Sequence, residues 1–243
     1  MLRKELGANF LSLTGYIIIA AVALLIGQSF VVLIRGLASD ASPMPVTESF
    51  YVTYYLWLIV LLGCPVITMR SFAMEKATGT FETLMTTQVR DGQVVGAKFC
   101  AALFFYMVAW LPLLACLFIV SHFTKQGGLD AGTVGGMFLG ILLLGSLFLS
   151  LGIFASSLTR SQMTAAMISF ALGMSLFSLA YLAMQQPSAS DWQSQVLSHF
   201  NMFEQMHDFA RGAVDTRAVV FYVSVTLLFL FLTLRVVETR RWK

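Results

Sequence analysis

Charged side chains are scarce in this chain: Asp, Glu, Lys and Arg make up 11% of its 243 residues, whereas hydrophobic residues make up 58%. A water-soluble domain ordinarily carries about 25% charged and about 45–50% apolar residues. A core of this size could not bury the excess, and the remainder would form exposed apolar patches that promote aggregation. The composition therefore excludes a water-soluble globular domain and indicates that lipid is the solvent.

Motifs for self-sufficient chemistry are also missing. The sequence has no GxxxxGK[ST] loop for a nucleotide, no GxSxG elbow and no HExxH pair. The three cysteines lack the His and carboxylate neighbours of a metal cluster, and His199 and His207 are too far apart along the chain to share a helical turn. We therefore expect no catalytic site, no metal and no cofactor in this chain.

Six apolar stretches are long enough to cross a bilayer, whose hydrocarbon core of about 30 Å needs about 20 helical residues. They run approximately over Gly15–Ile34, Phe50–Met69, Phe99–Ser121, Val134–Leu158, Met163–Met184 and Val219–Leu234. None has an ionisable residue in its central part, which excludes the intramembrane charges that ion-coupled carriers use. The fold class that follows is an all-α integral membrane protein with six transmembrane helices.

Positive charge is divided unevenly between the two sides of these spans. Of the 15 Lys and Arg residues, one side holds only Arg35, Lys125, Arg211 and Arg217. The positive-inside rule makes this the outer side, so both termini are expected in the cytoplasm. The first span follows Arg3 and Lys4 as a secretory signal would, but it is too long and lacks a small-residue cleavage pattern. We expect it to stay as an anchor in the inner or plasma membrane.

Two segments outside the spans have helical patterns of their own. Residues 1–13 predict an interfacial amphipathic helix, because one face collects Leu2, Leu6, Phe10 and Leu13. Residues 185–217 predict short external helices between the fifth and sixth spans, with an apolar face made of Met202, Phe203, Met206, Phe209 and Ala213. Gly212 suits the end of such a helix. This face could cover the exit of a substrate path or rest on the membrane surface, and the sequence leaves both open.

Glycine and proline indicate packing and bending within the spans. The fourth span carries Gly132, Gly136 and Gly140 at intervals of four, a pattern that lets another helix approach closely without identifying it. Pro65 and Pro112 lie inside the second and third spans, where each removes a backbone donor and can kink its helix. Such a kink could be a tolerated bend or a gating hinge.

The long cytoplasmic loop, residues 70–98, contains a short helical pattern that starts at Thr80 and includes Phe81, Leu84 and Met85. The loop also resembles the signature loop of ABC-2-type permeases. The residues that carry this resemblance are Arg70, Glu75, Lys76, Gly79, Thr80, Glu82 and Leu84, followed by Gly96 and Lys98. In that family, the loop contains a coupling helix that fits into a cleft on a separate nucleotide-binding subunit.

The resemblance covers residues 1–243 and implies a single ABC-2-type transmembrane domain. It assigns ATPase coupling to Glu75, Lys76, Gly79, Thr80, Glu82 and Leu84. Gly79 would permit a turn, and the carboxylates would face basic groups on the ATPase. The family often has a proline where this chain has Gln88, which leaves the end of the coupling helix open. The stretch from His199 to Gly212 resembles the external helices of permeases linked to gliding motility.

The resemblance implies the permease subunit of an ATP-binding-cassette exporter, which forms half of a substrate pathway. Its expected partners are a P-loop ATPase subunit that would hold ATP and Mg²⁺, a second permease subunit that is a copy or a paralogue, and membrane lipid, but no nucleic acid. A non-transporting membrane scaffold without an ATPase is the alternative. That alternative gives no reason for the ordered loop between Arg70 and Lys98. The sequence does not indicate the substrate.

The fifth span carries a methionine-rich stripe. At about 100° per residue, the following side chains fall within about 60° of one another on a helix: Met163, Met167, Met174, Ser178 and Tyr181. Methionine repacks readily around varied apolar ligands. We predict that this stripe lines a central cavity of the permease dimer, with a stripe that faces lipid or packs within the bundle as the alternative.

Overall fold

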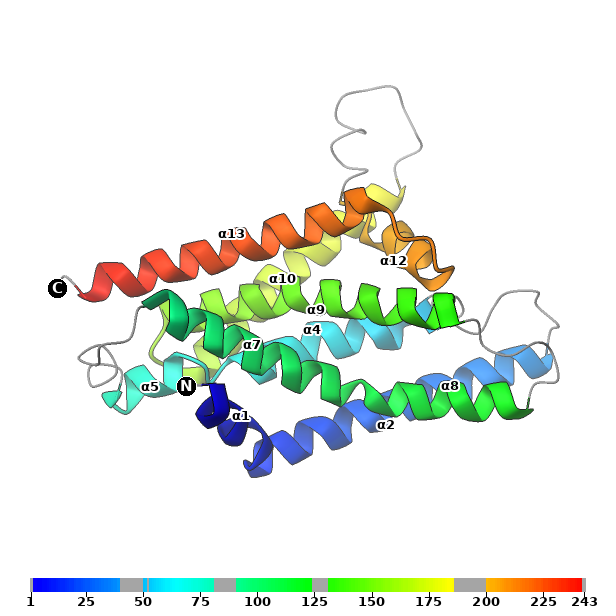
Figure 1. Cartoon of the computed structure of the whole chain (residues 1–243), viewed down its shortest axis with the longest axis horizontal. Coiled ribbons are helices and arrows are strands. Elements are labelled where there is room, and N and C mark those ends of the chain that lie inside the picture. The colour runs from blue at the N-terminus through cyan, green and yellow to red at the C-terminus, as the bar shows by residue number, and fades with distance from the viewer. Residues whose placement is uncertain are drawn as a thin grey trace, which may run out of the picture.

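The computed structural model describes residues 2–39, 50–51, 53–80, 91–123, 131–185 and 200–241. These residues form helices joined by turns and contain no strand (Figure 1). The helices are α1 (Leu2–Phe10), α2 (Leu13–Ser39), α4 (Tyr54–Thr68), α5 (Ala73–Ala77), α7 (Asp91–Ala109), α8 (Leu111–Phe123), α9 (Ala131–Leu158), α10 (Gln162–Gln185), α12 (Met202–Ala210) and α13 (Thr216–Arg241). Both termini lie at one end of the bundle, and α12 lies at the other.

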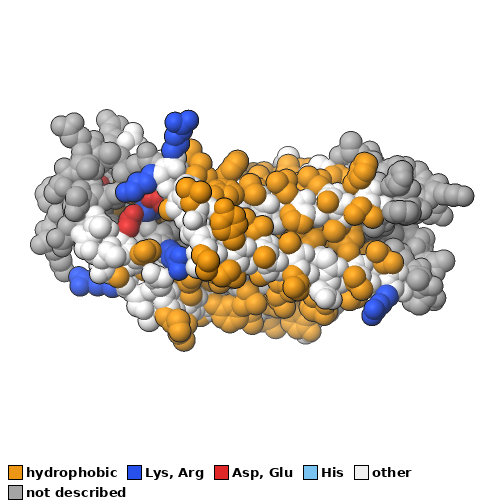
Figure 2. All heavy atoms as spheres, turned by 90° about the horizontal axis from the view of Figure 1, so that it is seen from below, with side chains coloured by type: hydrophobic (Ala, Val, Ile, Leu, Met, Phe, Trp, Pro, Cys, Tyr) orange, Lys and Arg blue, Asp and Glu red, His pale blue; other side chains and the backbone are white. Residues whose placement is uncertain are grey.

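The predicted all-α membrane fold with six spans is confirmed. Six helical stretches are long and apolar enough to cross a membrane: Leu13–Gly36, Tyr54–Ala77, Asp91–Ile119, Gly132–Leu158, Gln162–Gln185 and Thr216–Thr239. Hydrophobic side chains cover the middle of the bundle, and Lys and Arg gather mainly near the end that carries the termini (Figure 2).

Helix α9 is the centre of the bundle and contacts α4, α7, α10, α12 and α13. In its most apolar 18-residue stretch, 78% of the residues are buried, whereas the corresponding fraction is 28%, 22% and 17% in the first, fifth and sixth spans. These three spans therefore present most of their surface to lipid or to another subunit.

The glycine face of the fourth span packs against α12. A Cβ atom on Gly136 would lie 2.5 Å from the carbonyl oxygen of Phe209, and one on Gly140 would lie 3.0 Å from the Phe209 Cβ. The close approach that the sequence predicted is therefore present, and its partner is the short helix between the fifth and sixth spans.

The third span breaks at Trp110, where α7 ends and α8 begins. Pro112 has no N–H group and its ring would clash with the carbonyl of residue 108 in a continuous helix. The backbone instead tightens, with hydrogen bonds from Trp110 N to Met107 O (3.2 Å) and from Leu113 N to Trp110 O (3.0 Å). The sequence predicted one kinked helix over Phe99–Ser121, and the structure has two.

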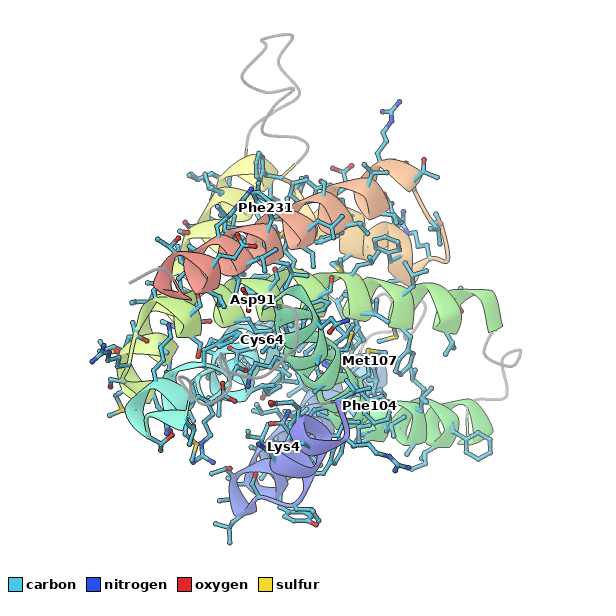
Figure 3. The ribbon with its side chains drawn as sticks, turned by 60° about the vertical axis from the view of Figure 1, so that its left-hand side comes forward. Lys4, Cys64, Asp91, Phe104, Met107 and Phe231 are labelled. Carbon is cyan, nitrogen blue, oxygen red and sulfur yellow. The ribbon has the colours of Figure 1, made fainter. Side chains whose placement is uncertain are left out.

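The predicted N-terminal helix is present as α1, which lies beside α7 (Figure 3). The Phe10 ring meets the Phe104 and Phe105 rings edge-on, with centroids 6.1 and 5.1 Å apart. The chain then turns sharply into α2, where Ser12 Oγ accepts a hydrogen bond from Gly15 N (3.1 Å). Helix α1 is thus held by side-chain contacts with the third span.

The packing of α12 on α9 predicts a difference between two neighbouring glycines. Gly136→Ala would press its Cβ into a backbone carbonyl, which we expect to cost about 1–3 kcal/mol of unfolding free energy. Gly135→Ala is the matched control, because no atom lies within 4 Å of its Cβ position. SDS-induced unfolding of the purified chain in mixed micelles measures both. Equal stability of the two variants would contradict the packing described.

Candidate functional site

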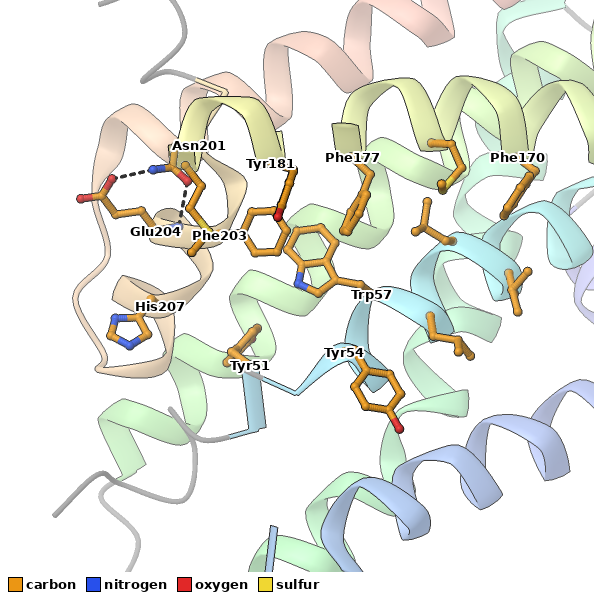
Figure 4. Close-up of a pocket in the computed structure, with 15 residues that line it drawn as sticks. Tyr51, Tyr54, Trp57, Phe170, Phe177, Tyr181, Asn201, Phe203, Glu204 and His207 are labelled. Atoms are coloured by element: carbon orange, nitrogen blue, oxygen red, sulfur yellow. Dashed lines mark hydrogen bonds between the residues drawn. The ribbon is translucent and has the colours of Figure 1, made fainter. Parts of the chain in front are cut away.

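A groove of about 920 Å³ lies between α4 and α10, with α12 at one end (Figure 4). This volume is within the range of sites for drug-sized ligands, about 300–1,000 Å³. The aromatic rings of its lining come from Tyr51, Tyr54, Trp57, Phe170, Phe177, Tyr181 and Phe203. Residues on three helices that are distant in the sequence therefore form one apolar, ring-lined surface.

An aromatic cluster joins these three helices at the α12 end of the groove. The Trp57 ring on α4 lies 4.5 Å from the Phe203 ring on α12 and 5.3 Å from the Phe177 ring on α10, measured between centroids. The Phe177 and Phe203 centroids are 5.5 Å apart. Offset and edge-on contacts of this kind favour a fixed arrangement of rings, so the cluster holds α4, α10 and α12 together at this end of the groove.

Helix α12 is fixed in place by its cap and by its buried face. Asn201 caps its N-terminus: the Asn201 Oδ1 atom accepts from Glu204 N (3.3 Å), and the Asn201 Nδ2 atom donates to Glu204 Oε2 (2.9 Å). Met202, Met206 and Phe209 are buried. The helix ends before Gly212, which adopts a φ of 80°. Three of the five residues of the apolar face that the sequence identified are thus buried, whereas Phe203 is half-buried and Ala213, beyond the end of the helix, is exposed. Phe203 and Glu204 border the groove.

At the opposite end of the bundle, the segment from Arg70 to Thr80 is tied to α9 and α2. The backbone N–H groups of Phe72 and Ala73 donate to the Ser156 Oγ atom, at 3.0 and 3.1 Å. Lys76 Nζ donates to the carbonyl oxygen of Ser157. Arg70 Nη1 donates to Thr14 Oγ1 (2.7 Å) at the start of α2. The C-terminal end of α9 therefore anchors this segment through both backbone and side chain.

Lys98 forms the charged centre of this end of the bundle. Its Nζ atom lies 2.9 Å from Glu5 Oε1 on α1 and 2.7 Å from Glu75 Oε1 on α5, and 5.2 Å from the Phe72 ring centroid. The Lys98 side chain is only 3% exposed, whereas those of Glu5 and Glu75 are 23% and 22% exposed. This cluster of Glu5, Glu75 and Lys98, here the charged triad, joins α1, α5 and α7.

A family model for ABC-2 family transporter proteins matches residues 35–236, which is most of the chain. The chain belongs to the ABC-2 transporter family. The membrane domain of this family is ordinarily non-catalytic and works with an ATPase partner. No curated protein matches the sequence.

Of the residues expected to couple an ABC-2 domain to its ATPase, Glu75, Lys76, Gly79 and Thr80 are described and lie at the end of the bundle that carries the termini. Gly79 adopts a φ of 73°, the left-handed conformation that favours glycine. Thr78 Oγ1 and Thr80 Oγ1 lie 2.9 Å apart. The sequence predicted that the Glu75 carboxylate faces basic groups on the ATPase. In the structure, this carboxylate instead pairs with Lys98 of its own chain. Glu82 and Leu84 lie outside the described residues.

The methionine-rich stripe of α10 lies partly in the groove of this ABC-2 domain. Met174 and Tyr181 belong to the groove lining. Met163, Met167 and Ser178 are exposed on the same helix outside that lining. The stripe therefore extends from the groove along the surface of α10 toward the end that carries the termini.

The contribution of α4 to the groove was missed by the sequence analysis. Tyr54 and Trp57 lie three residues apart on α4 and share one helical face, a spacing that was available as a signal, whereas Tyr51 lies before the start of that helix. Of the two histidines that the sequence offered as a metal pair, His199 lies outside the described residues and His207 lies on α12. Within the described part of the chain, no group of three His, Cys, Asp or Glu side chains could hold a metal ion.

The charged triad predicts a charge-dependent stability. Lys98→Met leaves two partly buried carboxylates without their cation, and we expect a loss of about 2–4 kcal/mol of unfolding free energy. Adding Glu5→Gln and Glu75→Gln removes the unpaired charges and restores most of this loss. Arg235→Met is the control, because its ion pair with Glu238 is exposed and contributes less than about 1 kcal/mol. A triple variant no more stable than Lys98→Met would contradict this account of the triad.

Proposed function

We propose that this ABC-2 chain is the permease subunit of an ATP-binding-cassette exporter, which forms half of a substrate pathway and is driven by a separate ATPase subunit. The observation that carries the proposal is the anchored segment from Arg70 to Thr80. It lies at the same end of the bundle as both termini, which are cytoplasmic in this proposal. A force on this segment would be passed directly to α9 through Ser156 and to α7 through Lys98.

In this scheme, ATP-driven closure of two ATPase subunits moves the coupling segments and shifts the spans between inward-facing and outward-facing states. The docking element consists of Lys76, Gly79, Thr80, Glu82 and Leu84, and Glu75 braces it from within. Because α9 contacts α4 and α10, a shift of α9 changes the two walls of the groove. The groove is then the part of the pathway that this subunit supplies.

A second permease subunit completes the pathway in this proposal. Only 17–28% of the residues in the most apolar stretches of the first, fifth and sixth spans are buried, which leaves surface for a partner as well as for lipid. The exposed side chains of Met163 and Met167 extend the groove surface along α10 and would meet that partner. The helix α12, whose end at Gly212 was part of the resemblance to permeases linked to gliding motility, supports placing the chain near that group.

Charge reversal in the docking element should release the ATPase. We expect Glu82→Lys to abolish or strongly reduce co-purification of a P-loop ATPase from the native host in mild detergent, because the carboxylate would face basic groups on the partner. Glu238→Lys is the control, since it makes the same charge change on α13 outside the docking element. Unchanged ATPase binding and stimulated hydrolysis in the Glu82 variant would refute the docking assignment. Recovery of no ATPase with the native chain would favour the scaffold alternative.

Cysteine cross-linking tests the position of the methionine stripe. In a chain with Cys64, Cys100 and Cys116 replaced by Ser, we expect Met167→Cys and Met174→Cys to form cross-links to a second permease subunit in at least one nucleotide state. Mass spectrometry of the product identifies a copy or a paralogue. Val220→Cys, on the exposed surface of the sixth span, is the control. Absence of a cross-linked permease in every nucleotide state would show that this stripe faces lipid.

A further inference from the structure

We infer that the groove between α4 and α10 accepts a drug-sized lipophilic cation, with an apolar body that packs on the aromatic rings and a positive charge near Glu204. This inference rests on the proposed function, since it names the class of substrate that the pathway would take. It follows from three properties of the lining: its aromatic faces, its single carboxylate and its lack of basic side chains.

The aromatic faces of the groove are available to a ligand. Tyr54, Tyr181 and Phe170 line it and remain exposed, in contrast to the packed cluster of Trp57, Phe177 and Phe203. An aromatic face attracts a cation within about 6 Å of its centroid, and the attraction grows when water is excluded. Rings on α4 and α10 thus border the groove from two sides and suit a cation that is itself apolar.

Glu204 supplies the only acidic side chain of the described groove lining, and no Lys or Arg is present in that lining. The Glu204 side chain is exposed at the α12 end, and Asn201 Nδ2 holds its Oε2 atom at 2.9 Å. This contact orients the carboxylate while its other oxygen, Oε1, can accept from or pair with a ligand. Among the remaining lining side chains, His207 is one turn further along α12.

Other ligand classes fit the lining less well. An anionic headgroup would meet Glu204 without a basic side chain from the described lining to balance its charge. A sugar chain needs many hydrogen-bonding groups, but the lining is dominated by apolar and aromatic side chains, and the Tyr51 hydroxyl already donates to Met137 O at 2.7 Å. A lipophilic cation can pack on the aromatic rings and pair with Glu204, and it needs no basic side chain in the described lining.

Two ions of the same shape and opposite charge test the inference. Tetraphenylphosphonium and tetraphenylborate are compared by equilibrium dialysis against the full-length chain in nanodiscs of neutral lipid, with empty nanodiscs subtracted. We expect saturable binding of the cation. We also expect Glu204→Gln to weaken it by about threefold to tenfold, because an amide keeps the size but removes the charge. Tyr181→Leu should weaken the cation more than the anion, since leucine keeps apolar area but has no aromatic face.

Asp208→Asn is the matched control, because Asp208 lies on the same helix but not in the groove lining. It lines a neighbouring polar pocket of about 210 Å³, which Glu204 also borders. We expect this variant to bind the cation as the native chain does. Tight binding of tetraphenylborate, or cation binding that is unchanged in Glu204→Gln, would overturn the inference. No saturable cation binding at all would also overturn it.

The binding experiment, taken together with ATPase co-purification and vesicle uptake, distinguishes a failure of this inference from a failure of the proposed function. If an ATPase co-purifies and depends on Glu82 but the anion binds as well as the cation, the substrate class is wrong and the exporter proposal stands. If the cation binds as expected but neither an ATPase nor ATP-driven uptake into inverted vesicles is found, the ligand class stands and the exporter proposal fails.

Discussion

Close backbone packing around α9 is the constraint on which the rest of the structure depends. Lipid tails are as apolar as the side chains, so helices in a membrane associate through tight packing and hydrogen bonds more than through the hydrophobic effect. A Cβ atom at Gly152 would lie 2.0 Å from Thr68 Oγ1, and one at Gly136 would lie 2.5 Å from the Phe209 carbonyl. These two glycines set how closely α4 and α12 can approach the central helix, and thus where the groove walls stand.

The same helix connects the two ends of the molecule. Ser156 holds the backbone of the segment from Arg70 to Thr80, and Gly136, 20 residues earlier on α9, contacts α12 beside the groove. At 1.5 Å per residue this separation is about 30 Å, the thickness of the hydrocarbon core. One continuous helix therefore spans the distance between the proposed docking element and the proposed ligand site. Because the segment from Arg70 to Thr80 and helix α12 both contact α9 directly, movement of α9 against α4 would displace both of them.

The sequence predicted those features that depend on composition and local periodicity. The spans followed from long apolar runs, and the buried face of α12 followed from Met202, Met206 and Phe209 at helical spacing. Contacts between residues far apart in the sequence could not be predicted from local patterns. The glycine pattern indicated a close neighbour without identifying α12, and nothing local links Lys98 to Glu5, 93 residues away. The α4 side of the groove was missed because an aromatic face on a membrane helix has the same pattern whether it lines a cavity or contacts lipid.

The charged triad explains why α1, α5 and α7 would move together. Desolvation of a charge is expensive, and a buried ion cluster is often no more stable than apolar residues of the same size. The triad matters instead because separating its members would cost free energy. The Lys98 side chain is only 3% exposed, so withdrawal of Glu75 or Glu5 would leave a buried cation with less opposite charge to compensate it. Glu75 Oε2 is itself buried without a hydrogen-bond partner among the described residues, so the pairing of Oε1 with Lys98 is what compensates this carboxylate. A displacement of α5 therefore favours joint movement with α1 and α7 over an opening between them, which is the property a coupling element needs.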